Sequence, residues 1–164
     1  MRDICFLLAT LILMTTASSA CLAQPASNQV VYQPGTNLAA QATVEVSSAA
    51  GRPGQKYSLE AVNDEQLDTW WASGAGVPLP QWVRLVFDTT HTIDTVVFMQ
   101  GDNPGLYANS RLLQLSFSDG STVQEELADH SGPFIIRFPA REVEWLRLDI
   151  LEDHGQKTYY TVRE

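Results

Sequence analysis

Residues 112–127 have the sequence LLQLSFSDGSTVQEEL, in which two short apolar patterns flank an Asp-Gly pair. Leu113, Leu115 and Phe117 alternate with the residues between them, which is the period-2 pattern of a strand with one buried face. The Asp-Gly pair tolerates the positive φ of a tight turn. We therefore predict that strands 112–118 and 122–127 pair directly as an antiparallel hairpin.

The same alternation extends over most of the chain from residue 37 onward, and no stretch of ten or more residues has a helical stripe. Further strands are predicted at 42–46, 81–87, 92–99, 134–138, 145–150 and from residue 159 onward. About eight short strands with almost no helix are typical of a β-sandwich. The predicted fold is therefore an all-β, antiparallel jelly-roll β-sandwich.

Length and charge exclude several classes of protein. The chain has 164 residues, enough for one domain with a proper core. Its 10 basic and 19 acidic residues give a net charge of −9, which disfavours binding to nucleic acid or to anionic lipid. A hydrophobic content of 45% is typical of a packed globular chain rather than a disordered one.

The amino-terminal region predicts export. An apolar run at residues 4–14 is followed by small residues, as in a secretory signal peptide, and it is too short to span a bilayer. The predicted cleavage is after Ala23, with Ala20 as the second choice. We expect a signal peptide at 1–23, a linker at 24–36 and one domain at 37–164, in a secreted or periplasmic protein.

Both cysteines of the chain, Cys5 and Cys21, lie in this leader. Cleavage after Ala23 would leave no cysteine, and therefore no disulfide and no thiol chemistry. A lipidated amino terminus at Cys21 is the alternative. Ser18 stands where a lipidation motif normally has Leu, and this favours the ordinary leader.

The stretch AVNDEQLDTWWAS, residues 61–73, combines acids, amides, a hydroxyl and two tryptophans. Ca²⁺ takes six to eight oxygen ligands, and one curled loop can supply several of them. Asp64 and Thr69 would provide side-chain oxygens, and Ala61 and Gln66 would provide main-chain oxygens. The alternative is an acidic surface loop with a turn at Asn63 and Asp64.

A series of short motifs runs through the chain in order. They are NLA at 37–39, SS at 47–48, the stretch at 61–73, QWVRLVF at 81–87, TIDTV at 92–96, FSDGS at 117–121 and WLR at 145–147. With these motifs the chain from Asn37 to its end resembles the discoidin, or coagulation factor V/VIII type C, superfamily of galactose-binding-like domains. This superfamily includes the family-32 carbohydrate-binding modules. The match is specific for the fold and not for the ligand.

The resemblance implies a structural Ca²⁺ held by Ala61, Asp64, Gln66, Thr69 and Glu164. The chain departs from the family pattern in two places, because Glu65 replaces a Gly and Gln66 replaces an Asn or Asp. Members of the superfamily usually continue for several residues past the position of Glu164. The last strand is therefore expected to be incomplete, in what would be a fragment or one module of a longer protein.

In carbohydrate-binding relatives the ligand sits on loops at one end of the sandwich, where an aromatic face stacks on a sugar ring. Trp71 matches the family's core tryptophan, which leaves Trp70 as the candidate platform. The alternatives are a Trp70 packed under a neighbouring loop and solvated polar loops. The candidate ligand-binding residues are Trp70, Asp102, Asn103, Tyr107, Asn109, Arg111, His154 and Tyr159.

The other aromatic residues have simpler interpretations. Trp82 and Trp145 lie in predicted strands and are assigned to the core, whereas His91 and His130 lie in or beside turns and are assigned to solvent. None of the histidines lies in a hydrolase or metalloprotease motif, and there is no Gly-rich phosphate loop. The chain is therefore not expected to be an enzyme.

The sequence predicts a carbohydrate-binding module that holds a partner enzyme or a cell surface near a polysaccharide. The alternative is an adhesion or protein-recognition module that uses the same loops. Direct membrane binding is not expected, because the apolar residues Val77, Pro78 and Leu79 have no basic neighbours.

Overall fold

The computed structural model describes residues 36–155 and 157–163. The predicted leader with its cysteines, the linker up to residue 35 and the candidate ligand Glu164 lie outside these ranges. Both helices of the described part, η1 (Ala39–Gln41) and η2 (Leu59–Val62), are short 3-10 segments that could not reach across a bilayer.

The described residues form two antiparallel sheets, which confirms the predicted fold class. The strands are β1 (Thr43–Val46), β2 (Trp71–Ala72), β3 (Gln81–Phe98), β4 (Ser110–Phe117), β5 (Thr122–Glu126), β6 (Phe134–Asp153) and β7 (Thr161–Val162). One sheet has the order β1-β3-β6-β4-β5, and the other pairs β2 with β7. The β2–β7 pairing joins residue 71 to residue 162 and so brings two distant parts of the chain together.

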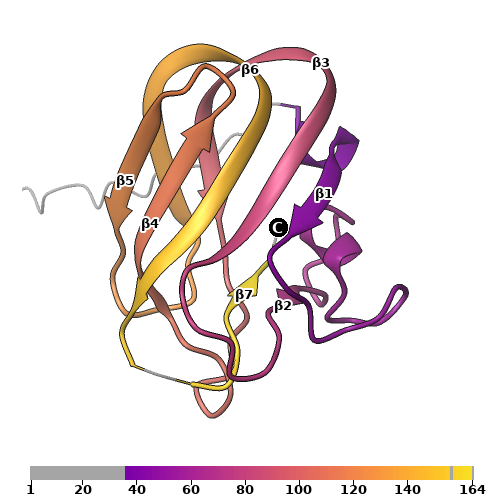
Figure 1. Ribbon diagram of the computed structural model, residues 1–164, viewed down its shortest axis with the longest axis vertical. Helices are drawn as coiled ribbons and strands as arrows, with labels where there is room; N and C mark the ends of the chain where they lie inside the picture. Colours follow the sequence, from indigo (N-terminus) through magenta and orange to yellow (C-terminus); the bar gives the residue numbers. More distant parts are fainter. Residues whose placement is uncertain (1–35, 156, 164) are drawn as a thin grey trace, which may run out of the picture. The chain divides into compact units, whose positions relative to one another are not determined.

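Strands β3 and β6 are longer than predicted, because each joins two of the predicted strands. They pair from Gln81↔Ile150 to Val86↔Trp145, and again from His91↔Val143 onward, with an irregularity between. Such an irregularity bends a strand without ending it. In Figure 1 both ribbons curve over at the same end of the sandwich, so their two halves contribute to opposite layers.

This bending places both ends of β3 and both ends of β6 at the opposite end of the sandwich (Figure 1). The segments that leave those ends therefore gather there. We call this region the loop end, and it comprises residues 47–58, 63–70, 74–80, 99–109, 127–133, 154–155 and 157–160.

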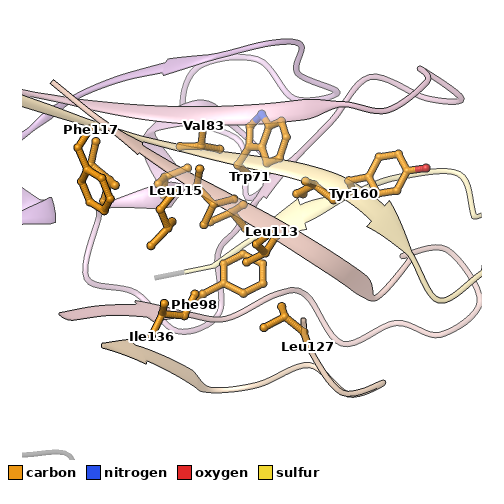
Figure 2. Close-up of a cluster of buried hydrophobic side chains, with 14 of the residues drawn as sticks. Trp71, Val83, Phe98, Leu113, Leu115, Phe117, Leu127, Ile136 and Tyr160 are labelled. Carbon is orange, nitrogen blue, oxygen red and sulfur yellow. The ribbon is translucent and has the colours of Figure 1, made fainter. Parts of the chain in front are cut away.

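The core lies between the layers and follows the predicted alternation. Leu113, Leu115 and Phe117 are at most 1% exposed, and the neighbours between them are half-buried. Figure 2 shows these side chains packed with others from several strands and loops: Trp71, Val83, Phe98, Leu127, Ile136 and Tyr160. Trp71 is fully buried, as the family resemblance implied.

The β4–β5 hairpin forms as predicted, with Leu113 opposite Glu125 and Leu115 opposite Val123. Gly120 alone supplies the positive φ of the turn, at +84°. Asp119 closes the turn, because its Oδ1 accepts a 2.8 Å hydrogen bond from the backbone N–H of Ser121.

The assignment of Trp82 and Trp145 to the core is wrong. Both are half-exposed, and each is covered by a guanidinium: Arg147 lies 4.6 Å from the Trp82 ring and Arg84 lies 4.5 Å from the Trp145 ring. The reason is the position in the strand. Val83 faces the core, so period 2 turns Trp82 to the outer face of the sheet.

The two histidines differ in their surroundings. His130 is exposed, as predicted, and stacks on Phe134 at a centroid distance of 4.4 Å. His91 is half-buried at the bend of β3, where its ring meets the edge of Phe87 at 5.2 Å.

Candidate functional site

Four aromatic side chains from four segments of the loop end contact one another. Tyr57 lies 5.2 Å from Trp70, Trp70 lies 5.8 Å from Tyr107, and Tyr107 lies 6.3 Å from Tyr159, measured between ring centroids. Because Trp71 points into the core, its neighbour Trp70 points the other way. A β-bridge between the backbones of residues 107 and 159 brings the other two rings of the group into contact. We call Tyr57, Trp70, Tyr107 and Tyr159 the aromatic cluster.

The four rings of the cluster differ in exposure. Tyr57 is 41% exposed, Trp70 and Tyr159 are half-buried, and Tyr107 is 8% exposed. In the described ranges the large exposed hydrophobic residues are Tyr57, Leu67 and Leu106, all in loops of this end. Apolar side chains gathered at one exposed place are typical of an interaction surface.

The structure thus brings together three of the candidate ligand residues, Trp70, Tyr107 and Tyr159. The ring with the greatest exposure, Tyr57, was missed by the sequence reading. The signal available for it was its place in a polar, Gly-containing segment, RPGQKY at 52–57.

Arg163 also belongs to this site, and the sequence reading did not identify it. Its guanidinium carbon lies 5.2 Å from the centre of the Trp70 ring, and its Nε is buried without a hydrogen-bond partner. The indole Nε1 of Trp70 is buried in the same way. It approaches the Tyr107 hydroxyl but lies outside hydrogen-bond geometry, and burial raises the pKa of Tyr107 above its ordinary value.

A depression of about 640 Å³ is lined in part by residues that are close in sequence to Tyr107 and Tyr159. It is lined by residues of three loops, including Val77, Leu79, Gly105, Asp153, Lys157 and Tyr160. Two of the loops that carry cluster residues and line the depression are hydrogen-bonded to each other. The carbonyl of Leu106 accepts hydrogen bonds from the N–H groups of Thr158 and Tyr159, at 3.2 and 3.1 Å.

Tyr160 belongs to the rim of the core, with its hydroxyl pointing away from the other labelled side chains in Figure 2. The hydroxyl donates a 2.8 Å hydrogen bond to Asp153 Oδ2. Burial, together with this carboxylate, raises the pKa of Tyr160 to about 12. The Tyr160 hydroxyl therefore stays protonated and acts as a hydrogen-bond donor.

Three other candidate residues are engaged with neighbouring segments rather than with the aromatic cluster. Asn109 Nδ2 donates to Asp129 Oδ1 at 2.8 Å, and His154 Nε2 lies 2.8 Å from the carbonyl oxygen of Leu127. Arg111 forms ion pairs with Glu126 and Glu152. These contacts hold the end of β6 to the β4–β5 hairpin.

The last two candidates, Asp102 and Asn103, are exposed in the segment before Tyr107. The backbone carbonyl of Asn103 accepts a 2.8 Å hydrogen bond from the N–H of Tyr107. The side-chain Oδ1 of Asn103 accepts a 3.2 Å hydrogen bond from the N–H of Gly105. Asn103 therefore shapes the turn that positions Tyr107.

The predicted metal loop gathers three of its oxygen donors. Thr69 Oγ1 lies 2.9 and 2.8 Å from the two carboxylate oxygens of Asp64 and 2.9 Å from the carbonyl oxygen of Gln66. Glu65 adopts a φ of +59°, the left-handed conformation that a Gly at this position allows. A set of hard oxygen donors such as this suits Ca²⁺.

The other two predicted ligands complete the description of this loop. Ala61 is buried on η2, next to the loop, and Glu164 lies outside the described residues. Asp68, also in the loop, bonds instead to Lys56 Nζ at 3.0 Å, and this contact holds the pKa of its carboxyl below the usual value. In the ranges described there is no group of three or more His, Cys, Asp and Glu side chains that could hold a metal.

Comparison with known proteins finds one matching family model. A protein-family model described as "Domain of unknown function (DUF7402)" matches residues 37–159. No curated protein matches the sequence at a significant level.

Solved structures share the fold at low sequence identity. The module CpGH89CBM32-5 from Clostridium perfringens, in complex with GalNAc-β-1,3-galactose, has a TM-score of 0.63 and 14% identity, over 76% of this chain and 92% of that one. The family 32 module of NanJ from C. perfringens, in complex with galactose, also has a TM-score of 0.63, with 10% identity over 76% and 90%.

A third similar structure is the chitosan-binding module 2 from Paenibacillus sp. IK-5, in complex with chitotriose. Its TM-score is 0.57 and its identity 21%, over 78% of this chain and 100% of that one. At these identities the likeness concerns the fold, and it confirms the predicted resemblance to family-32 modules.

Proposed function

The chain belongs to the DUF7402 family, and from the geometry of its loop end we propose that it is a non-catalytic carbohydrate-binding module. The observation that carries this proposal is the aromatic cluster with its exposed Tyr57 ring, together with a depression lined by Asp153 and Lys157. Aromatic faces stack on the apolar faces of sugar rings, and charged or amide side chains bond the hydroxyls. Similar folds hold sugars in their solved structures.

The arrangement of the cluster suits a preformed platform. Tyr57 presents its ring to solvent, and Trp70 supports it from behind. Trp70 is held in turn between Tyr107 and the guanidinium of Arg163. Side chains that are already ordered lose little conformational entropy on binding, so a rigid platform favours affinity.

The chemistry of the polar groups supports binding rather than catalysis. Tyr160, with its pKa raised to about 12, is not activated as a nucleophile or as a base. His154 contacts a backbone carbonyl, and Asn109 and Arg111 are bonded to carboxylates. These side chains hold the loops in place and act as hydrogen-bonding groups.

Ca²⁺ is part of this proposal. Asp64, Gln66 and Thr69 would hold the ion, with Ala61 and Glu164 as further ligands. A bound cation would neutralise charge in an acidic loop and stabilise the segment that leads into Trp70.

The proposal is tested by binding of the full chain to immobilised polysaccharides and to an array of oligosaccharides. Stacking contributes about 0.5–1.5 kcal/mol beyond area burial, so Tyr57→Ala should weaken binding roughly tenfold. The control is His91→Ala, which removes a ring at the bend of β3, away from the loop end. If no glycan binds the folded protein, or if both variants bind like the wild type, the proposal is wrong.

Export is also part of the proposal, and it would place the module near extracellular polysaccharides or a partner enzyme. The mass of the protein recovered from the expressing cells tests it. Cleavage after Ala23 gives an unmodified mature chain that begins at Gln24. A lipid-modified Cys21 at the amino terminus would support the anchored alternative instead.

A further inference from the structure

We propose that the loop end binds an acidic sugar, a uronic acid, whose carboxylate is bound by Arg163. This inference rests on the proposed carbohydrate-binding function and deepens it by naming the class of sugar. It starts from the charge of Arg163, which sits against the aromatic cluster and has no carboxylate partner among the described residues.

Arg163 differs from the other arginine that is buried in the same manner. Arg84 and Arg163 both have a buried Nε without a hydrogen-bond partner, and both stack on a tryptophan. Arg84 has a counter-ion, because its Nη1 lies 3.3 Å from Glu45. A half-buried guanidinium without a counter-ion is costly, and a ligand carboxylate would compensate its charge.

Asp68, a described acid whose carboxyl Arg163 attracts, is already engaged. Asp68 bonds to Lys56 at 3.0 Å, and Arg163 contributes only a weak additional attraction. The guanidinium of Arg163 is therefore left for a ligand. A carboxylate can accept two parallel hydrogen bonds from a guanidinium, whereas a sugar hydroxyl does not compensate its charge.

Basic side chains lie close to the cluster in sequence, although the whole chain carries a net charge of −9. The chain has two lysines, and both flank the cluster: Lys56 precedes Tyr57, and Lys157 comes two residues before Tyr159. Lys157 also lines the depression. Lys56 is paired with Asp68, so Lys157 is the lysine that can raise the local concentration of an anionic ligand.

Stacking and charge pairing can act on one sugar. Trp70 contacts both Tyr57 and Arg163, so the exposed ring and the guanidinium lie against the same side chain. A hexuronate has an apolar ring face and a carboxylate on the same residue. It matches both the exposed ring and the guanidinium, whereas a neutral hexose matches only the ring.

The test compares D-galacturonate with D-galactose, which share their ring stereochemistry and differ at C6. Titration calorimetry with the full chain at low salt should give at least about tenfold tighter binding of galacturonate. In Arg163→Gln the preference for galacturonate should be lost, so that the variant binds the two sugars with equal affinity. Addition of 0.5 M NaCl should reduce the preference of the wild type, because salt screens exposed charge pairs.

The control is Arg52→Gln, which removes an exposed arginine from the segment that also carries Tyr57. It should leave both affinities as in the wild type. A loss of affinity for both sugars to the same extent in Arg163→Gln would assign that residue a structural role and overturn the inference. So would equal binding of the two sugars by the wild type, which would leave the carbohydrate-binding function intact. If neither these sugars nor any glycan of the array binds, the proposed function fails as well.

Discussion

Glu65 is the one described residue other than glycine with a positive φ. It stands where related loops have Gly, and the loop nevertheless keeps Asp64 and Thr69 in contact. Glu65 therefore holds a strained backbone conformation in a loop that keeps this contact. A side chain in the left-handed region is unfavourable by about 1–2 kcal/mol, because Cβ approaches the following carbonyl oxygen.

Glu65→Gly should accordingly raise the melting temperature. The strain released is offset in part by the greater entropy of glycine in the unfolded chain, so the net gain is about 0.5–1 kcal/mol, or roughly 2–5 °C. Glu65→Ala is the matched control, since alanine retains Cβ and should give no gain. A melt in which both variants behave alike would contradict the strain argument.

Because of Tyr160, we expect the free energy of unfolding to depend on pH in the alkaline range. Its pKa is raised to about 12 in the folded protein, against about 10 in an unfolded chain, so the folded state holds the proton more tightly. The resulting stabilisation is complete below pH 10 and is lost as the pH rises from about 10 to about 12. Urea unfolding between pH 9 and pH 11.5 measures it.

In Tyr160→Phe this contribution is absent, so the stability of the variant should fall less steeply over the same range. The comparison with the wild type separates Tyr160 from the other groups that titrate there, including Tyr107. Parallel pH profiles for the two proteins would show that Tyr160 does not carry the effect.

At the scale of the element, the bends of β3 and β6 matter most. Residues 88–91 lie between two predicted strands, 81–87 and 92–99, but backbone pairing resumes at His91↔Val143 and β3 continues. Turn residues permit either a reversal or a bend, and the pairing partner decides between them. The β4–β5 connection is a true reversal, because Gly120 takes up a positive φ there.

Gly120→Ala should destabilise the hairpin. The position of a new Cβ is open, with no atom within 4 Å, so the cost is that of the φ of +84° alone. We expect a loss of about 1–2 kcal/mol, or roughly 3–8 °C in melting temperature. Gly155→Ala is the control, since its Cβ also meets open space and its φ is not positive. Equal melts for the two variants would contradict the prediction.

At the scale of the whole molecule, the β2–β7 pairing joins the segment after the metal loop to the end of the chain. Trp71 pairs with Val162, which places Arg163 beside Trp70. A Ca²⁺ held by the loop and by Glu164 would connect the same two segments. An ion that binds only the folded state stabilises the entire domain by mass action.

Ca²⁺ should therefore raise the melting temperature of the protein relative to a chelator. At a concentration one hundred times the Kd the expected stabilisation is about 2.7 kcal/mol, which corresponds to several degrees. Asp64→Ala should abolish the response. The matched control, Asp68→Ala, removes an acid of the same loop that pairs with Lys56 and should leave the response unchanged. A wild type that melts alike with and without Ca²⁺ would show that the loop does not bind the ion.

Sequence alone predicted the sheet fold and the hairpin at Gly120, because side-chain alternation and turn preference are local properties that neighbouring residues reveal. Alternation also placed Trp70 and Trp71 on opposite faces, and the family resemblance implied that Trp71 is the buried one. Tertiary structure decided the rest. Whether Trp82 faces in or out depends on which layer its strand joins, and this is settled by pairing with β6. Tyr57 and Arg163 meet at Trp70 only because β2 pairs with β7, a contact between distant residues that no local pattern encodes.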